Sequence, residues 1–242
     1  MQIIEPGWPA PVRVRGFSTT RSGGTSRGAY ASLNLGMNSN DEAAAVAANR
    51  QQLSGRLPAP PRWLHQVHGT RVIHLADWHA GIQADAAWTD RPDEVLAILS
   101  ADCLPILLAD AAGSFVAAIH GGWRSLAGGI VEAVLAALPA GKNDMMAWLG
   151  PGICARCYQV GSDVRAAFLQ TNPDLERFFL PDAGRWRLDL KGVAAFELMR
   201  CGIRVFDSRH CTVEEPGRFF SYRRDGQTGR LATLAWIDSG AG

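Results

Sequence analysis

Residues 100–129, SADCLPILLADAAGSFVAAIHGGWRSLAGG, contain two apolar runs on which the predicted fold depends. The runs at 104–109 and 114–120 have the length of buried strands, and the turn residues DAAG at 110–113 separate them. Residues 126–138, LAGGIVEAVLAAL, are apolar at helical spacing and follow directly from HGGWR. The stretch therefore predicts two strands joined by a turn and followed by a helix.

The rest of the chain adds strands and helices in an order that does not strictly alternate. Residues 12–19, VRVRGFST, alternate apolar and polar side chains and predict a strand. Residues 41–53 predict a helix with Asn40 or Asp41 as its cap. The other predicted elements are strands at 62–67, 71–75, 95–99, 144–149 and 203–207 and helices at 161–171 and 189–201. This order favours an α/β (α+β) fold, with mixed β-sheet layers and packed helices, over a doubly wound parallel sheet.

Length and composition predict one domain spanning residues 1–242. The Pro/Gly-rich patches at 57–62 and 181–186 are too short to separate domains, and no internal repeat is present. Hydrophobic residues make up 47% of the chain, which is enough for a sizeable core. A formal net charge of +1 is too balanced to predict binding to nucleic acid or a membrane surface. Because no exposed apolar helix is evident either, we expect a monomer.

The sequence also indicates the cellular compartment in which the protein is expected. Residues 1–17 lack the basic start and long apolar stretch of a secretion signal. No apolar stretch reaches the length of about 18 residues that a membrane span needs. Both points favour the cytoplasm, where thiols stay reduced. The five cysteines are an odd number, which also argues against a disulfide framework.

Three potential metal ligands each lie at the end of an apolar, strand-like run. They are His68 in QVHGTRV, Cys103 in SADCLPILLAD and His120 in AAIHGGWRSLAGG. Imidazole and thiolate both suit zinc, and three protein ligands leave a fourth position open, as in catalytic sites. The wide spacing is unlike that of zinc fingers, so only the fold can bring the three together. The alternative is that Cys103 is a buried thiol and His120 a core histidine.

His65 lies three residues before His68. In an extended strand, residues three apart point to opposite faces, so the two imidazoles are not expected to hold one ion together. We interpret His65 as an exposed neighbour of the site.

Several motifs in order resemble one protein family. HQVHG, ADCLP, HGGWR, LGPGICARCYQVG and FFSYRRDGQTGR, with STTRSGG and SLNLG near the N-terminus, are similar to the laccase-domain or multicopper polyphenol oxidase family. That family is also described as the purine nucleoside phosphorylase or peptidoglycan editing factor family. The resemblance runs from about residue 16 to residue 236. It implies one α/β domain and one zinc ion per chain, held by His68, Cys103 and His120. Cys154 and Cys157, close together in the chain, are not expected to be ligands.

The resemblance implies a zinc-dependent enzyme of purine nucleosides. The reactions are phosphorolysis of adenosine, inosine, guanosine and 5′-methylthioadenosine, and deamination of adenosine. A nucleoside and phosphate are then the small-molecule partners. Arginine suits phosphate, so we predict Arg124 and Arg21 as phosphate-binding residues, with surface ion pairs as their alternative role. Asn34 and the run Tyr222–Asp225 are expected to line the pocket or to brace the fold, and Trp123 to stack on the purine or lie in the core.

Proton transfer in these reactions needs an acid or base. Asp102, next to Cys103, and Asp85, in QADAAWTD, are the predicted catalytic residues. The alternative role of Asp102 is to orient a metal ligand or to cap a turn.

Two other activities are consistent with the same resemblance. One is a zinc hydrolase that edits peptidoglycan precursors. The other is a copper-dependent polyphenol oxidase. Copper fits less well, because a type-1 copper and a three-copper cluster require more imidazoles than the six histidines present. A zinc-stabilised binding protein without catalysis is a further alternative.

Overall fold

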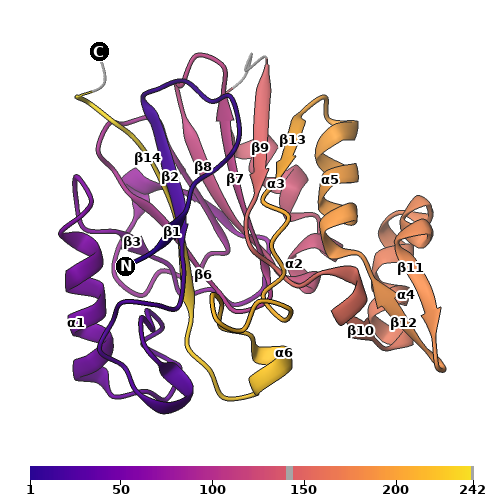
Figure 1. Cartoon of the computed structure of the whole chain (residues 1–242). Helices are drawn as coiled ribbons and strands as arrows, with labels where there is room; N and C mark the ends of the chain where they lie inside the picture. The colour runs from indigo at the N-terminus through magenta and orange to yellow at the C-terminus, as the bar shows by residue number, and fades with distance from the viewer. Residues whose placement is uncertain (140–143, 241–242) are drawn as a thin grey trace.

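The computed structural model describes residues 1–139 and 144–240. Two large β-sheets pack face to face at the centre of the molecule, with α1 (Ala43–Ser54) on one outer side and most of the other helices beyond the second sheet (Figure 1). These other helices are α2 (Trp123–Ala127), α3 (Ile130–Ala137), α4 (Ser162–Thr171) and α5 (Leu190–Arg200). The mixed α/β fold predicted from the sequence is confirmed.

The six-stranded sheet has the order β13-β9-β7-β8-β5-β4. Its strands are β4 (Val72–His74), β5 (Ala86–Thr89), β7 (Leu104–Asp110), β8 (Val116–Gly121), β9 (Met145–Leu149) and β13 (Arg204–Asp207). The antiparallel hairpin β7–β8 forms its centre, and every residue of both strands is buried. The pairs β13–β9 and β4–β5 are parallel, so the sheet is mixed.

The five-stranded sheet has the order β1-β2-β14-β6-β3. Its strands are β1 (Ile3–Ile4), β2 (Val14–Thr19), β3 (Arg62–Trp63), β6 (Leu96–Ser100) and β14 (Leu231–Ile237). The last strand of the chain, β14, lies in the middle of this sheet, between β2 and β6. A third, small sheet has the order β10-β12-β11, from β10 (Gln159–Val160), β11 (Phe179–Asp182) and β12 (Arg185–Leu188).

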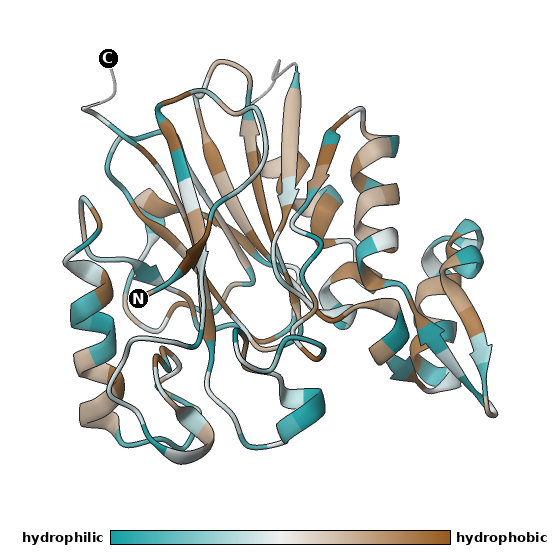
Figure 2. Cartoon of the chain, viewed as in Figure 1, coloured by the Kyte–Doolittle hydropathy of each residue, from teal (hydrophilic) through white to brown (hydrophobic). Residues whose placement is uncertain are grey.

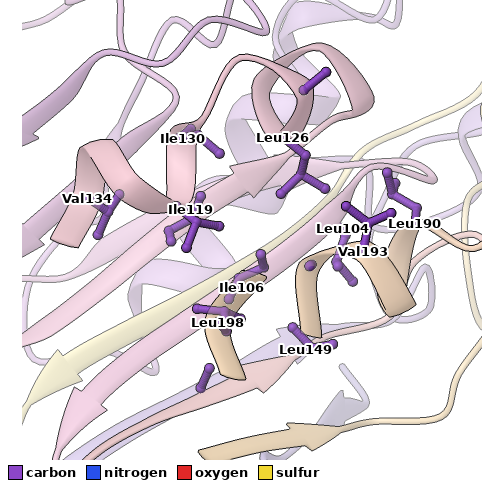
Figure 3. Close-up of a cluster of buried hydrophobic side chains, with 14 of the residues drawn as sticks. Leu104, Ile106, Ile119, Leu126, Ile130, Val134, Leu149, Leu190, Val193 and Leu198 are labelled. Carbon is purple, nitrogen blue, oxygen red and sulfur yellow. The ribbon is translucent and has the colours of Figure 1, made fainter. Parts of the chain in front are cut away.

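Alternation along the central strands supplies a core to each face. In β7, Leu107 and Ala109 point into the core between the two sheets, whereas Ile106 and Leu108 point toward the helices. On the helical side, β7, β8 and β9 pack against apolar residues of α2, α3 and α5 (Figure 3). The central strands are largely brown, whereas the ribbon of α6 (Tyr222–Asp225) is teal (Figure 2).

The helix predicted over 126–138 is two helices, so that boundary was wrong. Helix α2 ends at Ala127, and α3 begins at Ile130. Gly129, between them, has φ of 84°, a left-handed conformation that glycine adopts without a steric penalty. The apolar spacing continues across this break, which is why it reads as one helix.

Smaller differences concern strand lengths and a cap. The cap of α1 is Glu42, with no side-chain hydrogen bond, rather than Asn40 or Asp41. The predicted strand 62–67 pairs over Arg62–Trp63, with a separate bridge at His65. The strands that were not predicted include β5 and β14, the short β1, and all three strands of the small sheet. No helix within the described ranges is long and apolar enough to cross a bilayer.

The helical side of the core contains an acidic side chain. Glu197 of α5 is 9% exposed, and in the described part of the chain its Oε2 has no hydrogen-bond partner. Burial raises the pKa of Glu197 to about 8, and the negative charge of Glu132 on α3 adds to the increase. The folded protein therefore holds this carboxyl group in its protonated form over a pH range in which the unfolded chain releases the proton.

This shift predicts a pH-dependent effect of Glu197→Gln. Between about pH 5 and pH 8 the folded state binds more protons at Glu197 than the unfolded state, so wild-type stability falls as pH rises, by up to about 1.4 kcal/mol per pH unit from this group. Glu197→Gln has no titrating group at this position, so it lacks this decrease. The free energy of unfolding of the variant, relative to that of wild type, therefore increases with pH. Urea unfolding from pH 5 to 8 measures the difference, with the exposed Glu5→Gln as control. Parallel pH profiles for wild type and Glu197→Gln would contradict the shift.

Candidate metal centre

The three ligands predicted from the sequence lie together in the folded chain. One ligand atom each of His68, Cys103 and His120 lie within 4.8 Å of one another. Cys103 directly precedes β7, and His120 lies near the end of β8. Because Leu104 pairs with Gly121, the register of the hairpin places Cys103 next to this end of β8. His68 approaches from the loop after β3, with its Nε2 3.8 Å from Cys103 Sγ.

Gly122 leaves the space in which the ligands converge. A Cβ atom at this position would lie 2.9 Å from Cδ2 of His68, 3.4 Å from Sγ of Cys103 and 3.6 Å from Cε1 of His120. The backbone at Gly122 has φ of −68°, which any residue adopts, so the requirement for glycine comes from the ligands. The second glycine of HGGWR is therefore part of the centre.

The carboxylate of Asp85 organises two of the ligands. It is fully buried, directly before β5, and accepts a hydrogen bond of 2.8 Å from Nδ1 of His120. It also accepts the backbone N–H groups of Val67, His68 and Gly69, at 3.1, 2.9 and 2.7 Å. These bonds hold the loop in which His68 has φ of 59°. The bond to Nδ1 leaves Nε2 of His120 as the nitrogen available for a metal.

In the absence of a metal, Cys103 and His120 each stabilise the charged form of the other. Burial by itself raises the pKa of Cys103, but the charges and hydrogen bonds of His120 and His68 outweigh it and lower the pKa to about 6. Burial likewise opposes the charged form of His120, yet the Cys103 thiolate and Asp85 raise its pKa to about 9. Cys103 therefore favours the deprotonated form that binds metals.

These residues suit a metal ion in type and arrangement. Two imidazoles and one thiolate are a donor set that zinc uses, and catalytic zinc sites commonly have three protein ligands and an open position. A buried carboxylate behind a ligating histidine is the usual support for such a site, and Asp85 supplies it. Copper also accepts a donor set of two histidines and one cysteine, so ligand type alone does not distinguish the two metals.

The three ligands open into a cavity of about 650 Å³. That volume lies within the range of pockets for small ligands. Its other lining residues are Gly36, Met37, Asn38, Arg50, Trp63, Leu64, His65, Gln66, Gly81, Leu99, Ser100, Ala101, Tyr222 and Arg230. His65 is thus exposed beside the centre and lies outside the ligand group, in agreement with the sequence analysis.

Asp102, a predicted catalytic residue, lies outside the residues that line the cavity. Its Oδ1 accepts a 2.6 Å hydrogen bond from the Thr212 hydroxyl, and its Oδ2 accepts one of 2.6 Å from the backbone N–H of Arg223. Asp102 has φ of 95°, and its own carbonyl accepts from the N–H of Ile153. These contacts connect the segment before β7 to two other loops.

Arg21 and Asn34, predicted to bind substrate, make contacts within the fold. The Arg21 guanidinium donates to the carbonyls of Ala31 and Pro216, at 2.9 and 3.0 Å, and lies over the Phe220 ring. Asn34 is fully buried, and its Oδ1 accepts the backbone N–H groups of Gly36 and Arg230, at 3.0 and 2.8 Å. Asn34 therefore joins two segments that line the cavity without lining it itself.

Arg124, the other predicted phosphate-binding residue, is exposed on the five-residue helix α2. Its guanidinium lies 4.4 Å from the ring centre of Trp123, and neither residue lines the cavity. Of the run 222–225, Tyr222 lines the cavity. Arg223 instead donates to the carbonyl of Gln159, at 2.8 Å.

The sequence analysis missed the two arginines that line the cavity. Burial lowers the pKa of Arg50 to about 10, and it also lowers the pKa of Arg230. Arg50 Nε donates to the Leu35 carbonyl at 2.8 Å, and its guanidinium lies 4.1 Å from the Trp63 ring centre. Arg230 ends the motif FFSYRRDGQTGR, which was a usable signal, whereas nothing in the predicted helix 41–53 distinguished Arg50.

The geometry predicts that Asp85→Asn weakens metal binding. The amide keeps the shape of the carboxylate but cannot accept four hydrogen bonds, so His120 and the 67–69 loop lose their orientation. We expect about a 10- to 100-fold loss of Zn²⁺ affinity, the usual effect of such a supporting residue. Competition with a chromophoric chelator measures it. Asp90→Asn, which alters the exposed His74–Asp90 pair, serves as control, and equal affinities for the two variants would contradict the role of Asp85.

Comparison with known proteins identifies the family of this chain. Residues 15–238 match the family described as multi-copper polyphenol oxidoreductase laccase. A purine nucleoside phosphorylase of Pseudomonas aeruginosa is 43% identical over 237 residues, covering 97% of this chain and 98% of that protein. One of Haemophilus influenzae is 40% identical over 244 residues, covering 98% and 100%. The crystal structure of a Neisseria meningitidis protein superposes with a TM-score of 0.95 at 42% identity, covering 99% of this chain and 100% of that one. The motifs around the metal ligands predicted this result: the chain belongs to the multi-copper polyphenol oxidoreductase laccase family.

Proposed function

We propose that this protein is a zinc-dependent purine nucleoside phosphorylase that also deaminates adenosine. The observation that carries the proposal is that all three centre ligands line a cavity shared with Arg50, Arg230 and aromatic side chains. Metal ligands, cations and aromatic rings in one cavity suit a substrate with a phosphate, a sugar and a flat base. The purine nucleoside phosphorylases among the relatives support the same assignment.

Phosphorolysis exchanges one bond at the sugar. A phosphate oxygen forms a bond to C1′ of the ribose while the bond from C1′ to the purine nitrogen breaks. The bonding electrons pass to the purine, which takes up a proton, and the products are the free base and ribose 1-phosphate. The protein has to bring an anion to C1′ and hold the base as it leaves.

The two cavity arginines are our candidates for the phosphate site. Guanidinium groups match phosphate oxygens with two parallel N–H donors. Arg230 is held by hydrogen bonds to the carbonyls of Thr228 and Gly229, at 2.9 and 3.0 Å, and by the Asn34 bond to its backbone. Burial lowers the pKa of both Arg50 and Arg230, because it makes their positive charges less favourable. An anion bound beside them stabilises these charges.

Aromatic side chains offer surfaces for the base. Tyr222 is 62% exposed at the cavity, and the Trp63 indole lines it nearby. Aromatic faces stack on purines without distinguishing strongly among them, which suits a range of adenosine, inosine, guanosine and 5′-methylthioadenosine. Ser100, whose buried hydroxyl has no partner in the described residues, lines the same cavity and is available to a polar atom of the substrate.

Deamination uses the same site differently. Water adds at C6 of adenosine, and ammonia leaves as the carbonyl of inosine forms. When bound to His68, Cys103 and His120, zinc supplies the Lewis acidity that activates an oxygen nucleophile at neutral pH. We assign Asp85 and Asp102 positioning roles, because their carboxylate oxygens are engaged by His120 and the 67–69 loop and by Thr212 and Arg223.

The first prediction of this proposal concerns Cys103→Ala. Incubation of the purified zinc-loaded protein with adenosine and phosphate should release adenine, and incubation without phosphate should give inosine. The variant should lose at least about 100-fold in both rates while it stays folded, because a zinc site lacks one of its ligands. Chromatography of the bases measures the products, and Cys201→Ala, at an exposed thiol, is the matched control. Adenosine left intact by wild type containing zinc would exclude the proposed activity.

The second prediction separates the arginines. Arg230→Gln should raise KM for phosphate about 10- to 100-fold, the effect of losing a charged hydrogen bond, with a smaller change in KM for the nucleoside. Arg21→Gln should leave KM for phosphate unchanged and lower the melting temperature, because its guanidinium bonds to two carbonyls of the fold. Steady-state phosphorolysis at varied phosphate tests both. A larger phosphate effect in Arg21→Gln would assign the phosphate to the Arg21 loop instead.

A further inference from the structure

A second group of potential metal ligands lies outside the cavity. Sγ atoms of Cys154, Cys157 and Cys211 lie within 4.8 Å of one another. Cys154 caps the 3-10 turn η3 (Ala155–Cys157) and Cys157 is its last residue, and the N–H of Cys157 donates to the carbonyl of Cys154 at 3.0 Å. Cys211 comes from a distant part of the chain, which forms a parallel bridge to Gly152. From the sequence alone, Cys154 and Cys157 were not expected to be ligands, and the structure adds Cys211 to them.

The backbone around Cys211 is arranged for a negatively charged sulfur. The N–H of Cys154 donates to Cys211 Sγ at 3.3 Å. An N–H group that donates to a cysteine sulfur favours the thiolate, which is the form that binds metals.

The polar surroundings also distinguish the cluster from a packed core. Cys154 and Cys157 are half-buried, and Cys211 is buried. The carboxylate of Glu214 lies 3.8 Å from Sγ of Cys157, and both its oxygens accept from Arg156, at 2.9 and 2.7 Å. Glu214 therefore places carboxylate oxygens, which can also bind a metal, next to the cysteine cluster.

We propose that Cys154, Cys157 and Cys211 form a second, structural metal site for Zn²⁺, independent of the His68–Cys103–His120 centre. A tetrahedral zinc with Zn–S bonds of about 2.3 Å separates its sulfur ligands by about 3.8 Å, which the cluster reaches with small shifts. A CxxC pair and a third, distant cysteine are three of the four ligands of many structural zinc sites. The carboxylate of Glu214, or water, completes the coordination.

Binding at this site involves no change of oxidation state. Each thiol that ligates the ion releases its proton to solvent, and the bound cation offsets the repulsion between neighbouring thiolates. With water as the fourth ligand, three thiolates and one Zn²⁺ leave a net charge of −1. With the Glu214 carboxylate as the fourth ligand the charge is −2, and Arg156, which is paired with Glu214, reduces it to −1.

The position of the cluster indicates what the ion would do. It joins the segment around η3 to the loop 210–215, and both segments hold Asp102 next to the first metal ligand Cys103. The N–H of Ile153 donates to the Asp102 carbonyl at 2.9 Å, and the Thr212 hydroxyl donates to its carboxylate. A metal that links these two segments therefore stabilises the position of Asp102, next to Cys103, without taking part in the chemistry in the cavity.

Metal content of the full-length protein tests the second site. Protein isolated anaerobically with reductant is dialysed against Zn²⁺, and zinc is measured by mass spectrometry. Wild type should hold about two ions per chain, Cys103→Ala about one, Cys211→Ser about one, and the double variant essentially none. Cys157→Ser, at a half-buried position on a surface turn, provides a second variant in case Cys211→Ser does not fold. Cys201→Ser should keep the wild-type content.

Cobalt substitution provides a readout that a change in folding does not imitate. Thiolate-to-cobalt charge-transfer absorption is intense for a site with three thiolates and weaker for one with a single thiolate. Cys211→Ser and Cys157→Ser should remove most of this absorption, and Cys103→Ala only the smaller part. Wild type with about one zinc that neither cluster variant changes would overturn the proposal. So would a disulfide among the three cysteines in the anaerobically isolated protein. Neither outcome bears on nucleoside turnover at the first centre.

Discussion

The geometry of the candidate centre depends on the hydrogen bonds that the buried carboxylate of Asp85 accepts. An ionised carboxylate without solvent is costly unless it is fully hydrogen-bonded, and Asp85 accepts from three consecutive backbone amides and from the His120 ring. Burial by itself raises the pKa of Asp85, but the hydrogen bonds from His120 and Gly69 and the charge of His120 hold it below its ordinary value. The loop carrying His68 and the strand carrying His120 are therefore fixed by one side chain.

The sequence predicted much of this centre, and the part it missed has a physical explanation. His68, Cys103 and His120 each lie in a motif that the resemblance identified, and the β7–β8 hairpin places two of them together. Asp85 was also predicted as a site residue, but its predicted role was proton transfer and not the support of the ligands. Its hydrogen bonds to backbone N–H groups depend on a turn at Val67–Gly69 that no residue pattern encodes.

The fold was predictable where hydrophobic periodicity is uninterrupted. The strands β7 and β8 and the helices α4 and α5 lie close to their predicted ranges. The pattern failed at Gly129, where backbone conformation and not side-chain polarity ends a helix, and at β14, which follows the turn-rich motif FFSYRRDGQTGR. The arginines illustrate the same limit. Arg21 lies in a motif but its guanidinium bonds to carbonyls of the fold, whereas Arg50 lies in no motif and lines the cavity, and only tertiary contacts show this difference.

The place of β14 has a consequence for how the protein is made. This strand, residues 231–237, lies between β2 and β6 in the five-stranded sheet, and Arg230 immediately before it completes the cavity. A chain emerging from the ribosome presents His68, Cys103 and His120 long before that strand exists. The nascent polypeptide therefore carries all three candidate ligands while the five-stranded sheet still lacks its middle strand. During that interval the three side chains are not yet enclosed by the cavity that they line in the folded protein.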